Sequence, residues 1–384
     1  MAEGYLHVQI AEAQLSKNHG KPCGDFQEVL RSKTSTIQIL CDGLGSGVTA
    51  NLAAVMCASR IKQLLKSGFT VRETFEKMFK TMEHAKKNNL PYSVFSIVRI
   101  LNDGVTSIFS YEMPPPIFVS RNYSTILNQK KRDINGAVLY ESNCILKNGE
   151  GILVVSDGIT YSGIGTILSD GWGIEGLNKF ITNTLSEGIR NPLLPKLILD
   201  EAEKNWGYKL GDDCTVVFAR CCLGNIVNII TGPPVDPNTD KKIVSQFMNL
   251  KGLKVVCGAS TAKMVAREIG EELEMSSKYE SNIAPPNYDI NGLDLVTEGA
   301  VTLNQLYNIW DEDNSKFERK SPVTELYNLI SSSDKINFYV GNAFNEANED
   351  ISFKQTGILS RNKIIPLLKQ LFEEDGKLVE VVYN

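Results

Sequence analysis

The chain has 384 residues, of which 42% are hydrophobic and 22% are charged, and its formal net charge is −5 at pH 7. This length is enough for two domains, each with a sizeable core. A net negative charge without an extended basic tract argues against nucleic acid or an anionic membrane as the main partner. No apolar stretch is long enough to cross a bilayer and no signal peptide is visible, so we expect a cytoplasmic protein.

Periodic patterns predict a first domain over residues 1–230. In chain order we expect strands at 5–13, 26–31 and 35–41, helices at 47–66 and 71–87, strands at 92–101, 105–112, 116–119, 137–141 and 152–156, helices at 174–185 and 193–205, and strands at 215–220 and 226–230. This grouping is not a βαβ alternation. It fits an α+β fold in which two antiparallel sheets pack face to face, with a helix pair on each outer side (an αββα sandwich).

A linker is expected at 231–240, where Gly232-Pro233-Pro234 interrupts the pattern. Beyond it, residues 241–384 predict an α/β domain with some parallel strand pairing, with a regulatory, ligand-binding or partner-binding role. Its helices are expected at 241–249, 261–273, 303–310, 323–331 and 364–374, and its strands at 253–256, 293–296, 335–340 and 378–382. The small-residue turn after the strand at 253–256 could hold an anion at a helix start, or it could be a plain turn capped by Ser260 or Thr261.

Aspartates next to glycine or to a second aspartate stand at the predicted strand ends. They occur in Gly24-Asp25, in Asp42-Gly43-Leu44-Gly45-Ser46-Gly47, in Ser156-Asp157-Gly158 and in Asp212-Asp213-Cys214-Thr215. Asp-Gly alone is a common tight-turn pair. An ionised aspartate at the mouth of a buried sheet is costly unless it is neutralised, and several converging carboxylates need a cation. Ligand sets made only of oxygen favour hard ions such as magnesium or manganese. The eight cysteines form no CxxC pair, which argues against a zinc or iron–sulfur site.

These four segments, in this order, resemble the metal-dependent serine/threonine phosphatases of the PPM (type 2C) superfamily, in its bacterial SpoIIE-like branch. The resemblance covers residues 1–225 and implies the αββα sandwich. It also implies two divalent cations, Mn²⁺ or Mg²⁺, and hydrolysis of phosphoserine or phosphothreonine by a metal-bridging hydroxide. By the same resemblance Asp42 bridges the two metals, the Gly43 carbonyl ligates one of them, Asp25 holds one metal, and Asp157 and Asp212 hold the other. Asp213 is then a turn residue or an outer-sphere residue.

The resemblance implies a phosphorylated protein as the substrate, such as an anti-sigma-factor antagonist or a similar switch protein. The larger type 2C enzymes place a phosphate-binding arginine before the first acidic ligand. This chain instead has Lys17, His19 and Lys21 there, and lysine can also bind phosphate. The Gly45-Ser46-Gly47 turn could present backbone N–H groups to a phosphate, or Ser46 could cap the helix. Two alternatives stay open: a non-catalytic binding module on the same fold, and a phosphomonoesterase acting on a small molecule.

Overall fold

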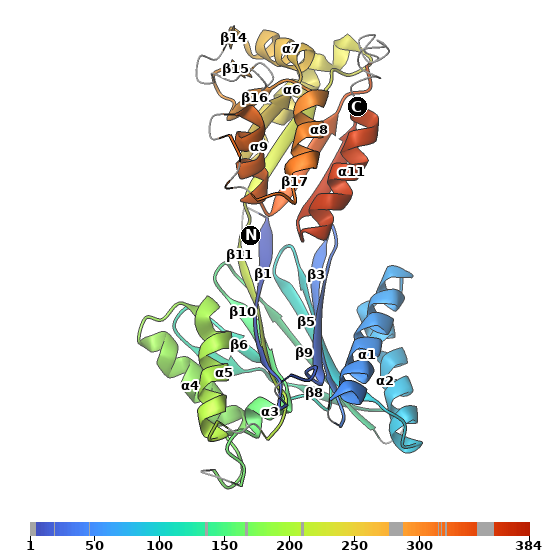
Figure 1. Cartoon of the computed structure of the whole chain (residues 1–384), viewed down its shortest axis with the longest axis vertical. Coiled ribbons are helices and arrows are strands. Elements are labelled where there is room, and N and C mark those ends of the chain that lie inside the picture. The colour runs from blue at the N-terminus through green and yellow to red at the C-terminus, as the bar shows by residue number, and fades with distance from the viewer. Residues whose placement is uncertain are drawn as a thin grey trace. The chain divides into compact units, whose positions relative to one another are not determined.

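The computed structural model describes residues 5–18, 20–45, 47–134, 137–165, 168–208, 211–275, 287–313, 315, 317–318, 321–343 and 357–384. The chain divides into two compact units, Met1–Leu223 and Gly224–Asn384 (Figure 1). Among the described residues, none of the helices has the length and apolarity needed to cross a lipid bilayer.

Two antiparallel sheets form the middle layers of the first unit. The first sheet contains, in spatial order, β1 (Leu6–Leu15), β11 (Cys214–Leu223), β10 (Gly151–Val155), β6 (Ile117–Val119) and β7 (Ser124–Ile126). The second contains β2 (Asp25–Arg31), β3 (Ser35–Gly43), β4 (Ser93–Leu101), β5 (Val105–Tyr111), β9 (Ala137–Ile145) and β8 (Lys130–Ile134). All neighbouring strands in both sheets pair antiparallel, as the sequence predicts.

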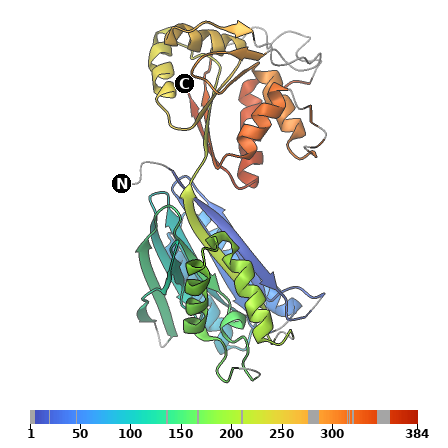
Figure 2. The same ribbon diagram turned by 90° about the vertical axis from the view of Figure 1, so that its left-hand side faces the viewer.

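Each sheet carries a helix pair on its outer face (Figure 1). Helices α1 (Val48–Lys66) and α2 (Val71–Lys87) pack against the second sheet, and α4 (Gly173–Ser186) and α5 (Leu194–Asn205) pack against the first. In Figure 2 the green helices of the second pair lie in front of the strands that they cover. The short helix α3 (Asp157–Thr160) and the 3₁₀ turn η1 (Asn191–Leu193) complete the unit. The expected αββα sandwich is therefore confirmed.

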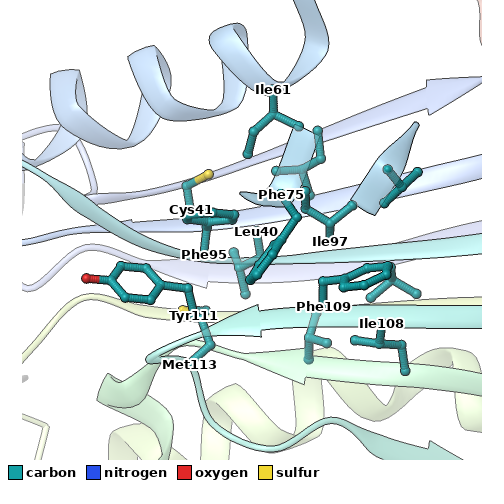
Figure 3. Packing of buried hydrophobic residues seen from close by; sticks show 14 of the residues in the cluster. Leu40, Cys41, Ile61, Phe75, Phe95, Ile97, Ile108, Phe109, Tyr111 and Met113 are labelled. Atoms are coloured by element: carbon teal, nitrogen blue, oxygen red, sulfur yellow. The ribbon is translucent and has the colours of Figure 1, made fainter. Parts of the chain in front are cut away.

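The main core of this unit lies on both faces of the second sheet and reaches the inner face of the first. Figure 3 shows Phe75 of α2 against the strand residues Phe95 and Phe109, with ring centroids 5.2 and 5.5 Å apart. Helix α1 approaches the sheet closely because its buried side chains are mostly small: Ala50, Ala53, Ala54, Cys57, Ala58, Ile61 and Leu64. Helix α2 starts at a capping box made by Thr70 and Glu73.

The second unit is a sheet with helices on both faces. The sheet contains, in spatial order, β14 (Glu274–Met275), β15 (Asn287–Asp289), β16 (Leu295–Thr297), β13 (Leu253–Cys257), β12 (Ile226–Thr231), β17 (Lys335–Val340) and β18 (Leu378–Tyr383). The last five pair in parallel, and β14 and β15 add an antiparallel edge. Numbered along the chain, the parallel strands are ordered 3-2-1-4-5, as in doubly wound nucleotide-binding sheets.

Helices cover both faces of this sheet (Figure 2). One side carries α6 (Asp240–Met248) and α7 (Ala259–Ile269), and the other carries α8 (Ala300–Ile309), α9 (Pro322–Ser331) and α11 (Arg361–Glu374). Each side has its own apolar core, because alternate residues of the central strands point to opposite faces. The expected α/β domain with parallel pairing is confirmed.

The boundary between the two units lies earlier than the sequence suggests. Strand β12 (Ile226–Thr231), expected to end the first domain, is the central strand of the second unit, hydrogen-bonded in parallel to β13 and β17. The division at Leu223 and Gly224 therefore replaces the expected one at residue 230. The expected linker at 231–240 is the connection from β12 to α6, and it contains the 3₁₀ turn η2 (Pro237–Thr239). The nearly continuous burial of β12 is typical of a central parallel strand.

Candidate metal centre

Two of the predicted ligands face each other across neighbouring strands. Asp25 is the first residue of β2, and in the strand register it lies directly opposite Asp42 near the end of β3. Like charges at directly opposed positions of an antiparallel pair destabilise the sheet. Asp25 is also only 2% exposed, and neither of its carboxylate oxygens has a hydrogen-bond partner of good geometry. A pair of this kind needs a proton or a cation between its members.

The other two ligands come from the opposing sheet. Asp157 follows β10 and begins the short helix α3, and Asp212 precedes β11, which pairs with β10. Both side chains are half-buried. The carboxylate of Asp212 accepts a hydrogen bond from the backbone N–H of Asp213 at 2.9 Å. The sandwich thus brings aspartates from four separate chain segments to one end of its two sheets.

The four carboxylates affect one another's ionisation. Burial, together with the charges of Asp25, Asp157 and Asp212, raises the pKa of Asp42 to about 9. Burial and the charges of Asp213 and Asp157 raise the pKa of Asp25 to about 7. The pKa values of Asp157 and Asp212 are also raised, in both cases chiefly by burial. Without a cation, the protein holds protons here at neutral pH, as expected for carboxylates that share one site.

Two hydroxyls that the sequence analysis did not single out lie beside Asp25. The hydroxyl groups of Ser156 and Thr215 lower the pKa of Asp25 and so offset part of the rise that burial causes. Ser156 Oγ accepts a hydrogen bond from the Thr215 N–H at 2.9 Å, which ties the end of β10 to the start of β11. Gln14 Nε2 donates to Thr215 Oγ1 at 3.0 Å and to the Asp25 carbonyl at 3.2 Å. Ser156 and Thr215 stand in the aspartate motifs, but their approach to Asp25 depends on the alignment of separate strands, and no local motif marks Gln14.

Asp213 holds two loops together. Its Oδ1 accepts a hydrogen bond from the backbone N–H of Lys17 at 2.7 Å, and its Oδ2 accepts one from that of Gly24 at 2.8 Å. Both carboxylate oxygens are therefore engaged by the segment just before Asp25. A Cβ on Gly24 would lie 2.7 Å from Asp213 Oδ2, so this approach requires glycine. Of the adjacent pair, Asp212 is the carboxylate left to bind a cation.

Gly43 is fixed by the helix that follows it. A Cβ at this position would overlap the carbonyl oxygen of Ala50 in the first turn of α1. The missing side chain lets α1 start directly above the end of β3. The N-cap of α1 is Gly47, at φ 68°, which has no side chain of its own to cap the helix. Ser46, the alternative cap, lies outside the described residues.

The donor set suits hard divalent cations. Every predicted donor is oxygen, and within the described residues the buried oxygens of Asp25 have no hydrogen bond of good geometry. Within the described ranges, no three His, Cys, Asp or Glu side chains are close enough to form a single preformed ion cage. Mg²⁺ does not need one, because it keeps several waters and takes one or two carboxylates. Asp25, Asp42, Asp157 and Asp212, with the Gly43 carbonyl, fit ions of this kind.

Lysines supply the positive charge beside the carboxylates. The charge of Lys17 lowers the pKa of Asp212, against the larger effect of burial. The side chain of Lys21 lies beside Gly47, with its Cδ 3.8 Å from where a Cβ would stand. Lys21 therefore reaches the start of α1. His19, the third candidate in this segment, lies outside the described residues.

The small-residue turn of the second unit is closely packed. Gly258, at φ 122°, is the N-cap of α7, and no side chain caps that helix, so the expected cap by Ser260 or Thr261 is wrong. The Thr261 hydroxyl instead accepts a hydrogen bond from the backbone N–H of Gly232 at 2.7 Å. A Cβ on Gly258 would lie 3.8 Å from the Cα of Gly299. Two strand-to-helix turns thus meet with little space between them.

The first unit matches a known protein family. Residues 32–221 match the family described as stage II sporulation protein E (SpoIIE). Asp42, Asp157 and Asp212 lie within the matched range, and Asp25 precedes it. No curated protein matches the chain.

Several solved structures are similar to this chain. The PP2C phosphatase domain of SpoIIE from Bacillus subtilis, with a fragment of its regulatory domain, is 16% identical with a TM-score of 0.49, and the match covers 57% of this chain and 63% of that one. The chain therefore spans less than two thirds of that structure. The RsbU and RsbW domains of a Mycobacterium tuberculosis protein are 15% identical with a TM-score of 0.49, covering 70% and 71%. RsbX in complex with magnesium is 16% identical with a TM-score of 0.40, covering 56% and 99%.

Proposed function

From a first unit that is a SpoIIE-like member of the PPM (type 2C) phosphatases, we propose that the protein is a Mn²⁺- or Mg²⁺-dependent serine/threonine protein phosphatase. The observation that carries the proposal is the cluster of Asp25, Asp42, Asp157 and Asp212, in which burial raises every pKa and repulsion from other members of the cluster adds to the rise at Asp25, Asp42 and Asp157. Holding four such carboxylates together is unfavourable for a protein that does not use them.

In the proposed reaction, Asp25, Asp42, Asp157, Asp212 and the Gly43 carbonyl hold two divalent cations. When bound, such cations lower the pKa of water and neutralise phosphoryl oxygens. Asp42 would be the central ligand, because its carboxylate is close enough to the other three aspartates for their charges to raise its pKa. Asp213 keeps the loop before Asp25 in place through its bonds to Lys17 and Gly24.

The chain's own groups would also bind the substrate phosphate. Lys21 lies beside Gly47 at the start of α1, where the helix dipole and the first backbone N–H groups favour an anion. Lys17 lies close enough to Asp212 to lower its pKa. Two lysines and a helix N-terminus around a phosphate would take the place of the arginine found in the larger type 2C enzymes. The substrate we propose is a phosphoserine or phosphothreonine protein, such as an anti-sigma-factor antagonist or a similar switch protein.

Hydrolysis of an aryl phosphate tests the reaction. The full chain is assayed with Mn²⁺, with Mg²⁺ and with EDTA, beside Asp42→Asn and the control Asp200→Asn on the exposed face of α5. We expect metal-dependent turnover in the wild type and the control and none in Asp42→Asn. A folded wild-type protein without turnover under any metal would contradict the proposal and favour a binding module. A panel of phosphopeptides and small phosphoesters then separates a protein phosphatase from a small-molecule phosphomonoesterase.

For the second unit we propose a regulatory role through a bound ligand or partner. In doubly wound sheets, ligands bind outside the carboxyl ends of the strands where the strand order reverses, here between β12 and β17. Arg361 lies at this point, with its guanidinium against Gly232 after β12 and its Nη2 donating to the Ala343 carbonyl after β17 at 3.2 Å. Arg361→Gln should change the regulation of turnover and leave Mn²⁺ binding unchanged. If Arg361→Gln weakened Mn²⁺ binding as much as it changed turnover, this role would be contradicted.

A further inference from the structure

A positively charged cavity lies in the first unit. It has a volume of about 490 Å³ and is lined by three arginines, Arg121, Arg190 and Arg220, together with Asn122, Asn191 and Gly149 among others. We call it the arginine pocket. No aspartate or glutamate lines it. In the described part of the chain, none of the three guanidinium groups forms an ion pair.

The arginine pocket is separate from the candidate metal centre. Strand β11 starts at Cys214, next to Asp212, and Arg220 lies six residues further along it. At about 3.3 Å per residue, this places the pocket roughly 20 Å from the aspartates. Arg220 shares the outer face of the sheet with Phe218, which packs in the core under α4 and α5. The pocket therefore lies on the outer side of the first sheet, beside the loop that joins these helices.

The turn at Gly149 positions Arg121 and the loop that carries Arg190. The guanidinium of Arg121 lies across Gly149, where a Cβ would stand 2.8 Å from its Nε, and Gly149 has φ 91°. Asn191, which is buried, donates from Nδ2 to the Gly149 carbonyl at 2.9 Å and so fixes the α4–α5 loop to this turn. The Gly149 N–H in turn donates to the Cys221 carbonyl at 2.8 Å. The arginine pocket is thus formed by ordered segments that hydrogen-bond to one another.

Arg220 carries a donor that no described residue pairs with. Its Nη1 donates to Gln9 Oε1 at 3.1 Å, but its Nε is buried and has no hydrogen-bond partner among the residues that the structure describes. A buried unpaired donor on a charged group is costly. An anion in the arginine pocket would offer this donor an acceptor and would pair with the exposed guanidinium groups of Arg121 and Arg190.

We propose that the arginine pocket binds a compact phosphate-type polyanion. Guanidinium groups match the paired oxygens of phosphate, and three of them can surround a group with several negative charges. The volume lies within the range of small-ligand sites. No aromatic residue lines the pocket, so it offers no ring on which a nucleobase could stack. This favours a pyrophosphate- or bisphosphate-like ligand over a nucleotide. The inference does not depend on the proposed catalytic function.

Calorimetric titration of the full chain with pyrophosphate tests the proposal. The protein is kept free of divalent metal with EDTA, so that the metal centre cannot contribute. We expect one saturable site per chain, weaker binding of inorganic phosphate, and lower affinity at higher ionic strength. Arg190 lies on an exposed loop. Arg190→Gln should weaken pyrophosphate binding about tenfold or more, because the substitution removes a charge-assisted hydrogen bond. Arg190→Lys should recover part of the affinity.

The matched control changes an arginine elsewhere in the same unit. Arg99 lines another cavity, of about 380 Å³, with Lys66, Phe69 and Leu30. Arg99→Gln removes the same charge and should leave pyrophosphate binding unchanged. Loss of binding in Arg99→Gln, with binding retained in Arg190→Gln, would contradict the proposal. So would equal weakening by both substitutions, or the absence of saturable binding to the wild-type chain at millimolar pyrophosphate.

Discussion

The two ends of strand β11 carry opposite charge and are built in different ways. At its start, Asp212 and Asp213 precede the first strand residue, and the other aspartates of the centre also adjoin strand ends. Towards its far end, Arg220 joins Arg121 and Arg190, which come from a hairpin turn and a helix–helix loop. The acidic end consists of short local motifs, whereas the arginine pocket exists only after the sheet and the loop have packed together. A site of the first kind can be recognised in a sequence, and one of the second kind cannot.

Asp42→Asn should have the largest effect on the acidic end. Removing the carboxylate coupled to the other three should lower metal-dependent turnover at least about a thousandfold, because metal ions contribute several kcal/mol to transition-state stabilisation. Steady-state hydrolysis with Mn²⁺ measures this. Pyrophosphate binding at the other end of the sheet should be unchanged in this variant, and a parallel loss there would show that the two ends are not separate sites.

Gly43→Ala should be the most destabilising single-methyl change near the centre. The added Cβ would overlap the Ala50 carbonyl, so α1 must move away from β3. We expect a loss of about 3 kcal/mol in the free energy of unfolding, measured by urea denaturation. Gly45→Ala is the comparison, since nothing lies within 4 Å of its Cβ position and its φ of 116° adds only local strain. Equal costs for the two variants would mean that α1 does not depend on the close approach.

Asp212 and Asp213 should separate into a functional and a structural residue. Asp213→Asn leaves one of the N–H groups of Lys17 and Gly24 without its acceptor, which should cost about 1–3 kcal/mol of stability. Asp212→Asn should abolish metal-dependent turnover with little loss of stability. Thermal unfolding and turnover of both variants check the assignment. The reverse pattern, with Asp213 essential for metal binding and Asp212 for stability, would overturn it.

The pH dependence of stability should differ between the metal-free and the metal-bound protein. The pKa values of Asp25 and Asp42 are raised to about 7 and about 9, so the folded state binds more protons than the unfolded state between about pH 4 and pH 9. The free energy of unfolding of the metal-free protein should therefore fall as the pH rises through this range. Saturating Mn²⁺ should remove the fall, and Asp42→Asn should reduce it. A metal-free stability that rises from pH 6 to pH 9 would contradict the raised pKa values.

Much of the fold could be predicted because the elements of the first unit have clear periods. Helices α1 and α2 and the strands around them lie within a few residues of their expected positions. Strand β8 was missed because it is a polar edge strand, and β7 because it has only three residues. Strand β12 was assigned to the wrong unit because it follows β11 after two residues and continues its apolar pattern. Its parallel partners, β13 and β17, are distant in sequence, so no local signal reveals them.

The candidate centre was predictable only in part, for a similar reason. The motifs point to Asp25, Asp42, Asp157 and Asp212, because a glycine stands next to each of them. They contain Ser156 and Thr215 without indicating a role for either, and they do not contain Gln14, because the contacts of all three depend on how β1, β10 and β11 align. The different roles of Asp212 and Asp213 also emerge only from the backbone groups that Asp213 binds.

The most direct test of the central claim is a calorimetric titration of the full chain with Mn²⁺ at pH 7, in buffers of different ionisation enthalpy. If the four aspartates share divalent cations, the wild-type chain should bind two ions and release protons, because Asp25 and Asp42 hold protons at this pH when metal is absent. Asp42→Asn should bind more weakly and release fewer protons. A folded wild-type chain that takes up no Mn²⁺, or that binds it without proton release and equally well in Asp42→Asn, would contradict the account.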